Sequence, residues 1–242
     1  MLRALVSLVV FAACGGRAAP PPTGPTTAPP APADGHADHH GHHPGTAAHD
    51  FADAAAWAAV FDDPERDAWQ KPDEVVALLA PGPGQTVADI GAGTGYFERY
   101  LTRAVGGAGK ILAIDSEPAM VAYIAERARR ELWSNVVAQH SAVDDPGLPT
   151  AAIDRVLVVD TWHHLPDRAR YAAKLAAALR PGSTLVVVDF TLDAAMGPPP
   201  AARVEAGVVV AELTAVGLTA RIADESLPHQ YVVVATKPTG AR

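Results

Sequence analysis

The sequence has a single cysteine, Cys14, among 242 residues. It therefore has no disulfide framework, no thiolate zinc site and no cysteine nucleophile in the part expected to fold. It also lacks any run of Lys or Arg, and its formal net charge is −8. Nucleic-acid backbones are bound by clustered basic side chains, so this composition argues against them as the main partner. A small-molecule substrate fits it better.

The first 14 residues are typical of an export signal. Arg3 precedes an apolar run of about ten residues, which is the length of a signal-peptide core and too short to remain across a bilayer. The run ends in FAACGG, which resembles a bacterial lipoprotein lipobox with Cys14 as the lipid-anchored residue, although Phe11 replaces the usual Leu. We therefore expect a lipid-anchored or periplasmic protein of a bacterial envelope. The alternatives are an ordinary secretory signal, or an unprocessed tail on a cytoplasmic protein.

Residues 15–50 are rich in Pro, Ala, Thr and His, a composition that buries too little apolar surface to order itself. We interpret them as a tether. Imidazoles in such a tract can bind Ni, Cu or Zn weakly. Nothing fixes their geometry, so a solvated linker is the favoured interpretation and no specific metal site is expected. The histidines concerned are His36, His39, His40, His42 and His43.

Residues 51–84 are predicted to form a small helical cap in front of the main domain. Trp57, Val60 and Phe61 repeat at helical spacing and indicate an amphipathic helix. Asp63 followed by Pro64 is typical of a capped helix start. A further short helix is expected from residue 72 to residue 80, where a Pro/Gly cluster ends it.

Strand and helix patterns alternate through residues 85–242, which we interpret as one catalytic domain. Several strands are continuous apolar runs, which is typical of a parallel sheet covered on both faces. The last two strands are too close for a crossover helix and should form an antiparallel hairpin. The predicted fold is a doubly wound, Rossmann-like α/β sheet of seven strands, mostly parallel. The predicted strands are 86–90, 110–115, 135–140, 154–160, 183–190, 218–222 and 231–235, and the predicted helices are 96–105, 117–132, 166–180 and 201–216.

The stretch TVADIGAGTGYF, residues 86–97, is a strand followed by a glycine turn and a helix. Glycine allows unusual dihedrals there and lets a ligand approach the backbone. The spacing is G-x-G-x-G and not the G-x-G-x-x-G of dinucleotide-binding proteins. Asp89 precedes the turn, and Asp115 ends the second strand twenty residues after Gly95. A carboxylate at that strand end can accept both ribose hydroxyls, so the pattern predicts an adenosine cofactor.

This motif, VADIGAGTG, resembles the first motif of the class I S-adenosylmethionine-dependent methyltransferases, and the resemblance covers about residues 51–236. It implies S-adenosylmethionine as cofactor and methyl transfer to a small-molecule acceptor as the activity. It also implies that Asp89 and the glycine backbone hold the aminocarboxypropyl end, Asp115 the ribose and Asp144 the adenine amino group. Asp160 and Thr161 would then lie beside the methyl group. The full set of implied cofactor contacts is Asp89, Gly91, Ala92, Gly93, Gly95, Asp115, Ser116, Asp144, Asp160 and Thr161.

His163 and His164 follow the fourth strand at the edge where doubly wound folds bind ligands. Either could be a general base for an acceptor that must lose a proton, or could simply cap the following helix. The branch of the family that this sequence most resembles pairs such histidines with a WQ-P segment, here Trp69 to Pro72. Acceptor selectivity is expected from the segments 51–72, 162–167 and 193–200.

Two other functions compete with methyl transfer. A nicotinamide-dependent oxidoreductase would share Asp115, but it should have a later third glycine and a catalytic Tyr/Lys pair, which the sequence does not show. A non-enzymatic envelope lipoprotein could keep the cofactor-binding fold behind a histidine-rich metal-binding arm. The export signal favours this alternative, because S-adenosylmethionine is made in the cytosol.

Overall fold

The computed structural model describes residues 53–240. The predicted export signal with Cys14, the tether and its histidines lie outside these residues. Among the helices that are described, none is both long and apolar enough to cross a membrane.

Three short helices precede the sheet: α1 (Ala54–Phe61), α2 (Arg66–Gln70) and α3 (Pro72–Leu79). The carboxylate of Asp53 caps α1 by accepting the N–H of Ala56 at 3.0 Å. The prediction that Asp63 caps the next helix is wrong. Asp63 accepts the N–H of Glu65 at 2.8 Å, and α2 starts at Arg66 without a side-chain cap. Pro64 therefore lies in a turn before the helix.

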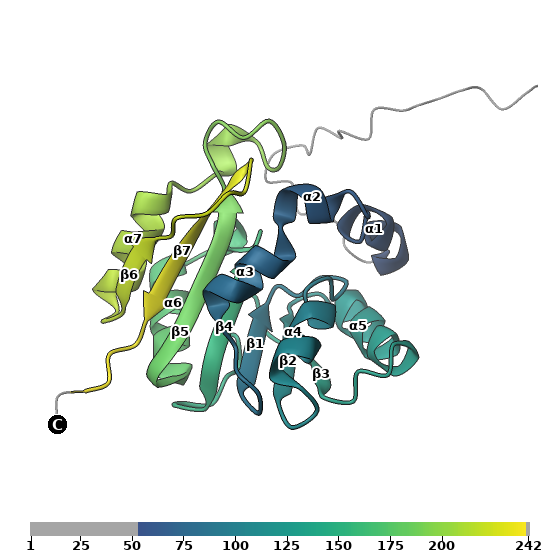
Figure 1. Cartoon of the computed structure of the whole chain (residues 1–242). Coiled ribbons are helices and arrows are strands. Elements are labelled where there is room, and N and C mark those ends of the chain that lie inside the picture. The colour runs from purple at the N-terminus through teal and green to yellow at the C-terminus, as the bar shows by residue number, and fades with distance from the viewer. Residues whose placement is uncertain (1–52, 241–242) are drawn as a thin grey trace, which may run out of the picture. The chain divides into compact units, whose positions relative to one another are not determined.

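The seven strands form one sheet with the order β3-β2-β1-β4-β5-β7-β6, in which β7 runs antiparallel to both of its neighbours (Figure 1). This topology confirms the predicted fold class, including the terminal hairpin. The strands are β1 (Thr86–Ile90), β2 (Lys110–Asp115), β3 (Val136–His140), β4 (Ile153–Val159), β5 (Leu179–Phe190), β6 (Thr219–Ile222) and β7 (Gln230–Thr236).

Two elements differ from the prediction by more than two residues. Strand β5 begins four residues early, because Leu179 already pairs with Ile153 before a register shift in β4. The helix expected over 201–216 is two elements separated by an extended Arg203. The helical elements after β1 are α4 (Glu98–Val105), α5 (Pro118–Arg130), η1 (Trp162–His164), α6 (Arg168–Ala178), η2 (Pro200–Ala202) and α7 (Ala206–Ala215).

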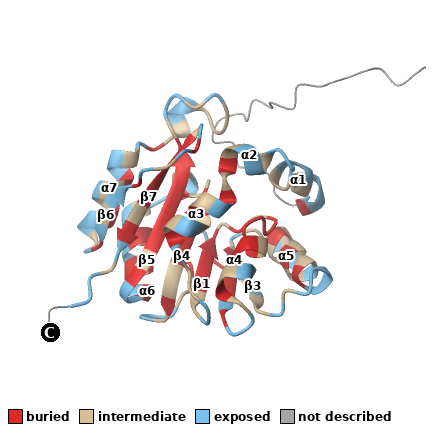
Figure 2. Cartoon of the chain, viewed as in Figure 1, coloured by how far each residue is buried: buried red, intermediate tan, exposed pale blue. Residues whose placement is uncertain are grey.

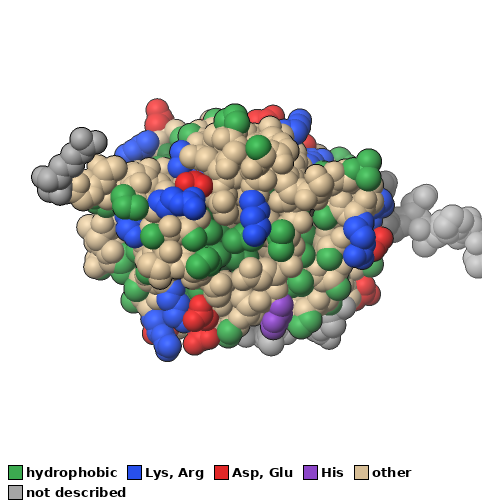
Figure 3. All heavy atoms as spheres, turned by 90° about the horizontal axis from the view of Figure 1, so that it is seen from below, with side chains coloured by type: hydrophobic (Ala, Val, Ile, Leu, Met, Phe, Trp, Pro, Cys, Tyr) green, Lys and Arg blue, Asp and Glu red, His purple; other side chains and the backbone are tan. Residues whose placement is uncertain are grey.

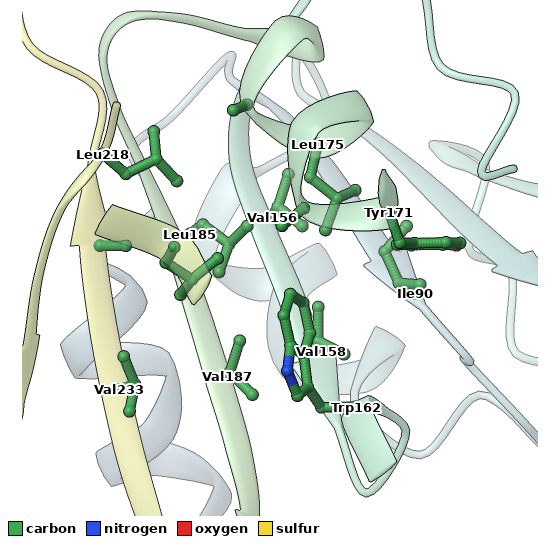
Figure 4. Packing of buried hydrophobic residues seen from close by; sticks show 14 of the residues in the cluster. Ile90, Val156, Val158, Trp162, Tyr171, Leu175, Leu185, Val187, Leu218 and Val233 are labelled. Atoms are coloured by element: carbon green, nitrogen blue, oxygen red, sulfur yellow. The ribbon is translucent and has the colours of Figure 1, made fainter. Parts of the chain in front are cut away.

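The central strands are buried on both faces, as Figure 2 shows for β1, β5 and β7. Alternate residues of each strand enter different cores because side chains alternate across a sheet. Val156 and Val158 pack with Leu175 of α6 and Trp162 (Figure 4). Leu157 and Val159 enter the other core, with Val75 and Leu79 of α3 and Leu101 of α4. The helices therefore cover the sheet from both sides, as the continuous apolar runs predict.

The order of the strands fixes where a ligand can bind. Chain order runs outward from β1 to β3 on one side and from β4 to β5 on the other, so the direction of the winding reverses between β1 and β4. Loops from the carboxyl ends of β1, β2 and β4 therefore meet at one edge, which is where doubly wound folds bind ligands.

On the face seen in Figure 3, Lys and Arg side chains are scattered among acidic and apolar ones.

Candidate functional site

The loop after β1 has the backbone that its sequence predicts. Gly91, Gly93 and Gly95 all have positive φ, at +71°, +58° and +82°. The N–H groups of Gly91 and Ala92 donate to the carbonyl of Ile114 in β2, at 2.8 and 3.0 Å. The loop is thus fixed to the end of the neighbouring strand.

Gly91 is in contact with the loop after β4. A Cβ on Gly91 would lie 2.2 Å from Oγ1 of Thr161, so no larger residue fits without a rearrangement. Thr161 is itself held by donating its hydroxyl to the carbonyl of Val159 at 2.8 Å. Two predicted cofactor contacts from separate strand ends are thereby brought together.

Asp115 joins the end of β2 to the same loop. Its carboxylate accepts the N–H of Gly93 at 2.8 Å and the N–H of Glu117 at 2.9 Å. Burial raises the pKa of Asp115, although these backbone hydrogen bonds favour the charged form. A carboxylate offers about four lone-pair sites, so acceptors remain for ligand hydroxyls. Ser116, the next residue in the predicted set, is exposed beside it.

Asp89 is almost completely buried in β1, and it lies against a carboxyl group that is not among the predicted site residues. That group is Glu98, which is fully buried in the first turn of α4. Burial and the Glu98 carboxyl both raise the pKa of Asp89. Glu98 falls in a segment that resembles an ordinary amphipathic helix, so nothing in the pattern marks it as buried.

Asp160, directly after β4, has a left-handed backbone with φ of +53°. Such a conformation is uncommon outside glycine and is concentrated at functional sites. The Asp160 carboxylate is 3.5 Å from the guanidinium of Arg66 and accepts a hydrogen bond from the Gln230 amide. Burial raises the pKa of Asp160 to about 7, with Arg66 opposing the shift. Gln70 completes the network by donating to Gln230 at 2.6 Å, so α2 is joined to the end of β4.

His163 is paired with Asp189 of β5. Its Nδ1 is 2.8 Å from Oδ1 of Asp189, and its backbone N–H donates to Oδ2 at 3.1 Å. The side chains are 4% and 0% exposed. Burial lowers the pKa of His163, but the hydrogen bond and charge of Asp189 outweigh it, so the net shift is upward. Asp189 is not among the predicted site residues, although a carboxylate inside the apolar run of residues 185–190 is a usable signal.

The other two predicted residues lie at the rim of this edge. His164 is exposed, with its ring centroid 4.1 Å from that of His163. Asp144 follows β3 in a loop that Lys174 holds, by donating to the Asp144 carbonyl at 2.7 Å and to the Asp145 carboxylate at 2.9 Å. The same loop is joined to β2 because the N–H of Ser141 donates to the carbonyl of Asp115 at 3.0 Å.

The segment before the sheet rests on the glycine loop. A Cβ on Gly93 would meet the ring of Phe61 at 3.5 Å. Arg127 of α5 forms an ion pair with Asp62 at 2.8 Å and donates to the carbonyl of Thr94 at 2.9 Å. Helices α1 and α2 therefore form one wall of the site. This segment is one of those predicted to determine acceptor selectivity, but none of these contacts is evident from the sequence.

Within residues 53–240, no group of three or more His, Cys, Asp or Glu side chains is arranged to hold a metal ion. The predicted weak metal ligands, His36 to His43, lie outside the residues that the structure describes. A surface groove between α2 and α4, lined by Asp67, Arg99 and Tyr100 among others, contains none of the predicted site residues.

Comparisons with known proteins find similarity to methyltransferases. Residues 87–182 match the model of a methyltransferase domain family. An uncharacterized methyltransferase of Mycobacterium tuberculosis is 32% identical over 133 residues, 55% of this chain and 51% of that protein. The 27-O-demethylrifamycin SV methyltransferase of Amycolatopsis mediterranei is 28% identical over 121 residues, 50% of this chain and 44% of that protein. This chain thus spans about half the length of the curated relatives it matches.

The fold comparison extends further along the chain. The crystal structure of a SAM-dependent methyltransferase from Aquifex aeolicus has a TM-score of 0.69 and 27% identity, covering 76% of this chain and 97% of that one. The resemblance inferred from the sequence is supported at the level of a methyltransferase domain.

Proposed function

We propose that this protein is an S-adenosylmethionine-dependent methyltransferase that acts on a small-molecule acceptor by in-line displacement. The observation that carries the proposal is that Asp89, Asp115 and Asp160 lie at the same edge of the sheet as the glycine loop. These carboxyl groups come from the ends of three neighbouring parallel strands. The matched methyltransferase domain spans all three.

The residues present fit the proposed cofactor. Asp115 has acceptor sites left for the ribose hydroxyls, and Asp89 provides a carboxyl for an ammonium group. Gly91 lets the chain pass close to Thr161 without a side chain between them. When bound, S-adenosylmethionine supplies an electrophilic methyl group on a positively charged sulfur. The protein's task is then to align the acceptor with that methyl group and to exclude water.

The His163–Asp189 pair supports an acceptor that loses a proton, such as a hydroxyl or phenol. An ionised Asp189 can only accept, so it fixes the proton of neutral His163 on Nδ1 and leaves Nε2 as the basic atom. A histidine oriented in this way is suited to general-base catalysis. The rifamycin relative, whose name specifies an O-methylation, points to the same acceptor chemistry. His164 is assigned to the rim of the acceptor site.

We further propose that residues 1–14 direct the protein to a bacterial envelope and that Cys14 carries a lipid anchor. The proposal rests on the lipobox-like sequence alone. Replacing Cys14 by Ala should move the protein from the membrane fraction to the soluble fraction and abolish incorporation of labelled palmitate. Unchanged fractionation would contradict the anchor.

Calorimetric titration of the protein with S-adenosylmethionine, NADH and Zn²⁺ separates the competing functions. We expect one S-adenosylmethionine per chain and no binding of NADH. Binding of NADH alone would favour an oxidoreductase, and binding of Zn²⁺ alone would favour a metal-binding envelope protein. A screen of hydroxyl- and phenol-containing acceptors, monitored by release of S-adenosylhomocysteine, then identifies the substrate. Cofactor binding without turnover on any acceptor would leave a cofactor-binding protein that is not an enzyme.

A further inference from the structure

Glu98 is an unusual residue for the core of this domain. It is 0% exposed, and no group of residues 53–240 donates a hydrogen bond of normal geometry to either of its carboxyl oxygens. Its Oε2 lies 3.2 Å from the position that a Cβ on Gly95 would occupy, so the carboxyl points at the backbone of the glycine loop. A buried polar group without a partner is costly and calls for an explanation.

The groups around Glu98 do not neutralise it. Asp89 of β1 interacts with it, and the charge of Asp115 of β2 also acts on Asp89. Arg127 of α5 approaches, but its Nη1 is bound by Asp62, directly after α1, and by the carbonyl of Thr94, and its buried Nε donates no hydrogen bond to Glu98 or to any other described group. Arg66 of α2 is the remaining cation near Asp89, and it is held by Asp160 and Gln70. The site therefore places two carboxyls together, and neither of the nearby cations forms a hydrogen bond with Glu98.

Burial raises the pKa of Glu98 to about 7, even though its own backbone N–H and Arg127 favour the charged form. Burial and the neighbouring Glu98 also raise the pKa of Asp89. Two facing carboxyls that cannot both ionise retain a proton between them near neutral pH. A cation bound at Asp89 would stabilise the charged form of both carboxyls, so the shared proton would be released.

We propose that Asp89 and Glu98 form a proton-linked receptor for the ammonium group of the cofactor's aminocarboxypropyl end. Glu98 is a positioning residue that acts through Asp89. In the free protein the two carboxyls share one proton, and the arriving ammonium group replaces it, so one proton is released for each cofactor bound. This inference rests on the proposed function, and it adds Glu98 and the linked proton to it.

The pH dependence of binding follows directly. Below about pH 7 the affinity for the cofactor should rise with pH, by up to tenfold per unit, because the free receptor must lose a proton to bind. An α-ammonium group starts to titrate only near pH 7.7–8.0, which is roughly the upper limit of the useful range. A ligand that lacks the aminocarboxypropyl group should not show this dependence.

The test is calorimetric titration of the protein with S-adenosylhomocysteine between about pH 5.5 and about pH 7.0. Buffers of different ionisation enthalpy give the number of protons released. Wild-type protein should bind more tightly as the pH rises and release close to one proton at the acidic end. The Glu98→Gln variant keeps the shape of the side chain but removes the neighbouring carboxyl that raises the pKa of Asp89. Its dissociation constant should therefore depend less steeply on pH than that of wild type, and it should release fewer protons on binding.

Two controls make the result specific. Glu126→Gln alters an exposed glutamate on α5 that pairs with Arg129, and it should behave as wild type. 5′-Methylthioadenosine contains the adenosine but no ammonium group, so its binding should not vary with pH in any variant. A wild-type affinity for S-adenosylhomocysteine that is independent of pH, or a Glu98→Gln variant that releases as many protons as wild type, would overturn the inference. No binding of either nucleoside to wild-type protein would instead overturn the proposed function.

Discussion

The carboxylate of Asp115 at the end of β2 accepts the backbone N–H of Gly93 at 2.8 Å, so the proposed ribose-binding residue also holds the glycine loop in shape. Replacing Asp115 by Ala removes both roles at once. We expect the dissociation constant for S-adenosylhomocysteine to rise by more than about tenfold, as for the loss of charge-assisted hydrogen bonds. Calorimetry measures the change, with Asp145→Ala as the matched control, because Asp145 is an exposed carboxylate that pairs with Lys174. An unaltered dissociation constant for Asp115→Ala would refute the assignment.

Gly91 should be more sensitive to substitution than another glycine of the same backbone conformation. Gly84 also has positive φ, at +79°, but a Cβ there would meet nothing within 4 Å. Gly84→Ala therefore carries backbone strain alone, about 1–2 kcal/mol. Gly91→Ala adds the collision with Thr161, worth about 1–3 kcal/mol more. Chemical denaturation measures both variants, and Thr161→Ala should partly restore the Gly91→Ala protein. Equal losses at the two glycines would contradict the packing described for the loop.

His163 and Asp189 should control turnover without affecting cofactor binding. Once an acceptor is known, His163→Ala should lower kcat by about 10²–10⁴-fold, the usual contribution of a general base. The pKa of His163 is raised above its usual range by Asp189. Activity should therefore fall as the pH drops through that pKa, since the base becomes protonated. Asp189→Asn should lower kcat and move the acidic limb to lower pH. A His163→Ala protein with normal turnover would contradict the general-base role of His163. So would an Asp189→Asn protein whose pH–activity profile keeps the acidic limb of wild type.

Titration of Asp160 should lower the folding stability of the cofactor-free protein as the pH rises. Burial raises its pKa from 3.8 to about 7. Between these two pKa values the folded protein holds a proton that the unfolded chain has released. The contribution of Asp160 to folding stability is therefore fully present below pH 3.8 and is lost as the pH rises to about 7. Asp160→Asn cannot titrate and tolerates the left-handed backbone, so it should flatten the decrease in Tm across this interval. Thermal unfolding followed by circular dichroism gives the comparison, and an equally steep decrease in the variant would contradict the assignment.

Arg127 should hold α1 on the glycine loop. Its guanidinium joins Asp62 to the carbonyl of Thr94 and is 12% exposed. Arg127→Ala should lower the local opening free energy of α1 by about 1–3 kcal/mol, seen as faster amide hydrogen exchange. Arg129→Ala, which removes an exposed pair with Glu126 on the same helix, should leave the exchange of α1 unchanged. If both variants exchange alike, the ion pair with Asp62 does not hold α1.

Most of the fold could be predicted from the sequence because its signals are local. Apolar runs such as Val156–Val159 marked the buried strands, and the close spacing of the last two strands marked the hairpin. Asp89, Asp115 and Asp160 could be placed at one edge, since parallel strands present their carboxyl ends together. The structure bears out that arrangement for all three.

The missing parts of the site depend on contacts between distant segments. Gln70 meets Gln230 across 160 positions of the chain, and no periodicity predicts such a pair. The helical pattern around Glu98 suggests a solvent-facing side chain, and only the structure shows that it is buried. His163 and His164 are equivalent in the sequence, and only the position of Asp189 distinguishes the buried one.

A crystal structure of the protein with S-adenosylhomocysteine tests the central claim most directly. We predict ligand density at the carboxyl ends of β1, β2 and β4, with the ribose hydroxyls on Asp115, the ammonium group at Asp89 and the sulfur facing the Asp160–Thr161 turn. Density in the groove between α2 and α4, or no density at a saturating concentration, would contradict the assignment of this site.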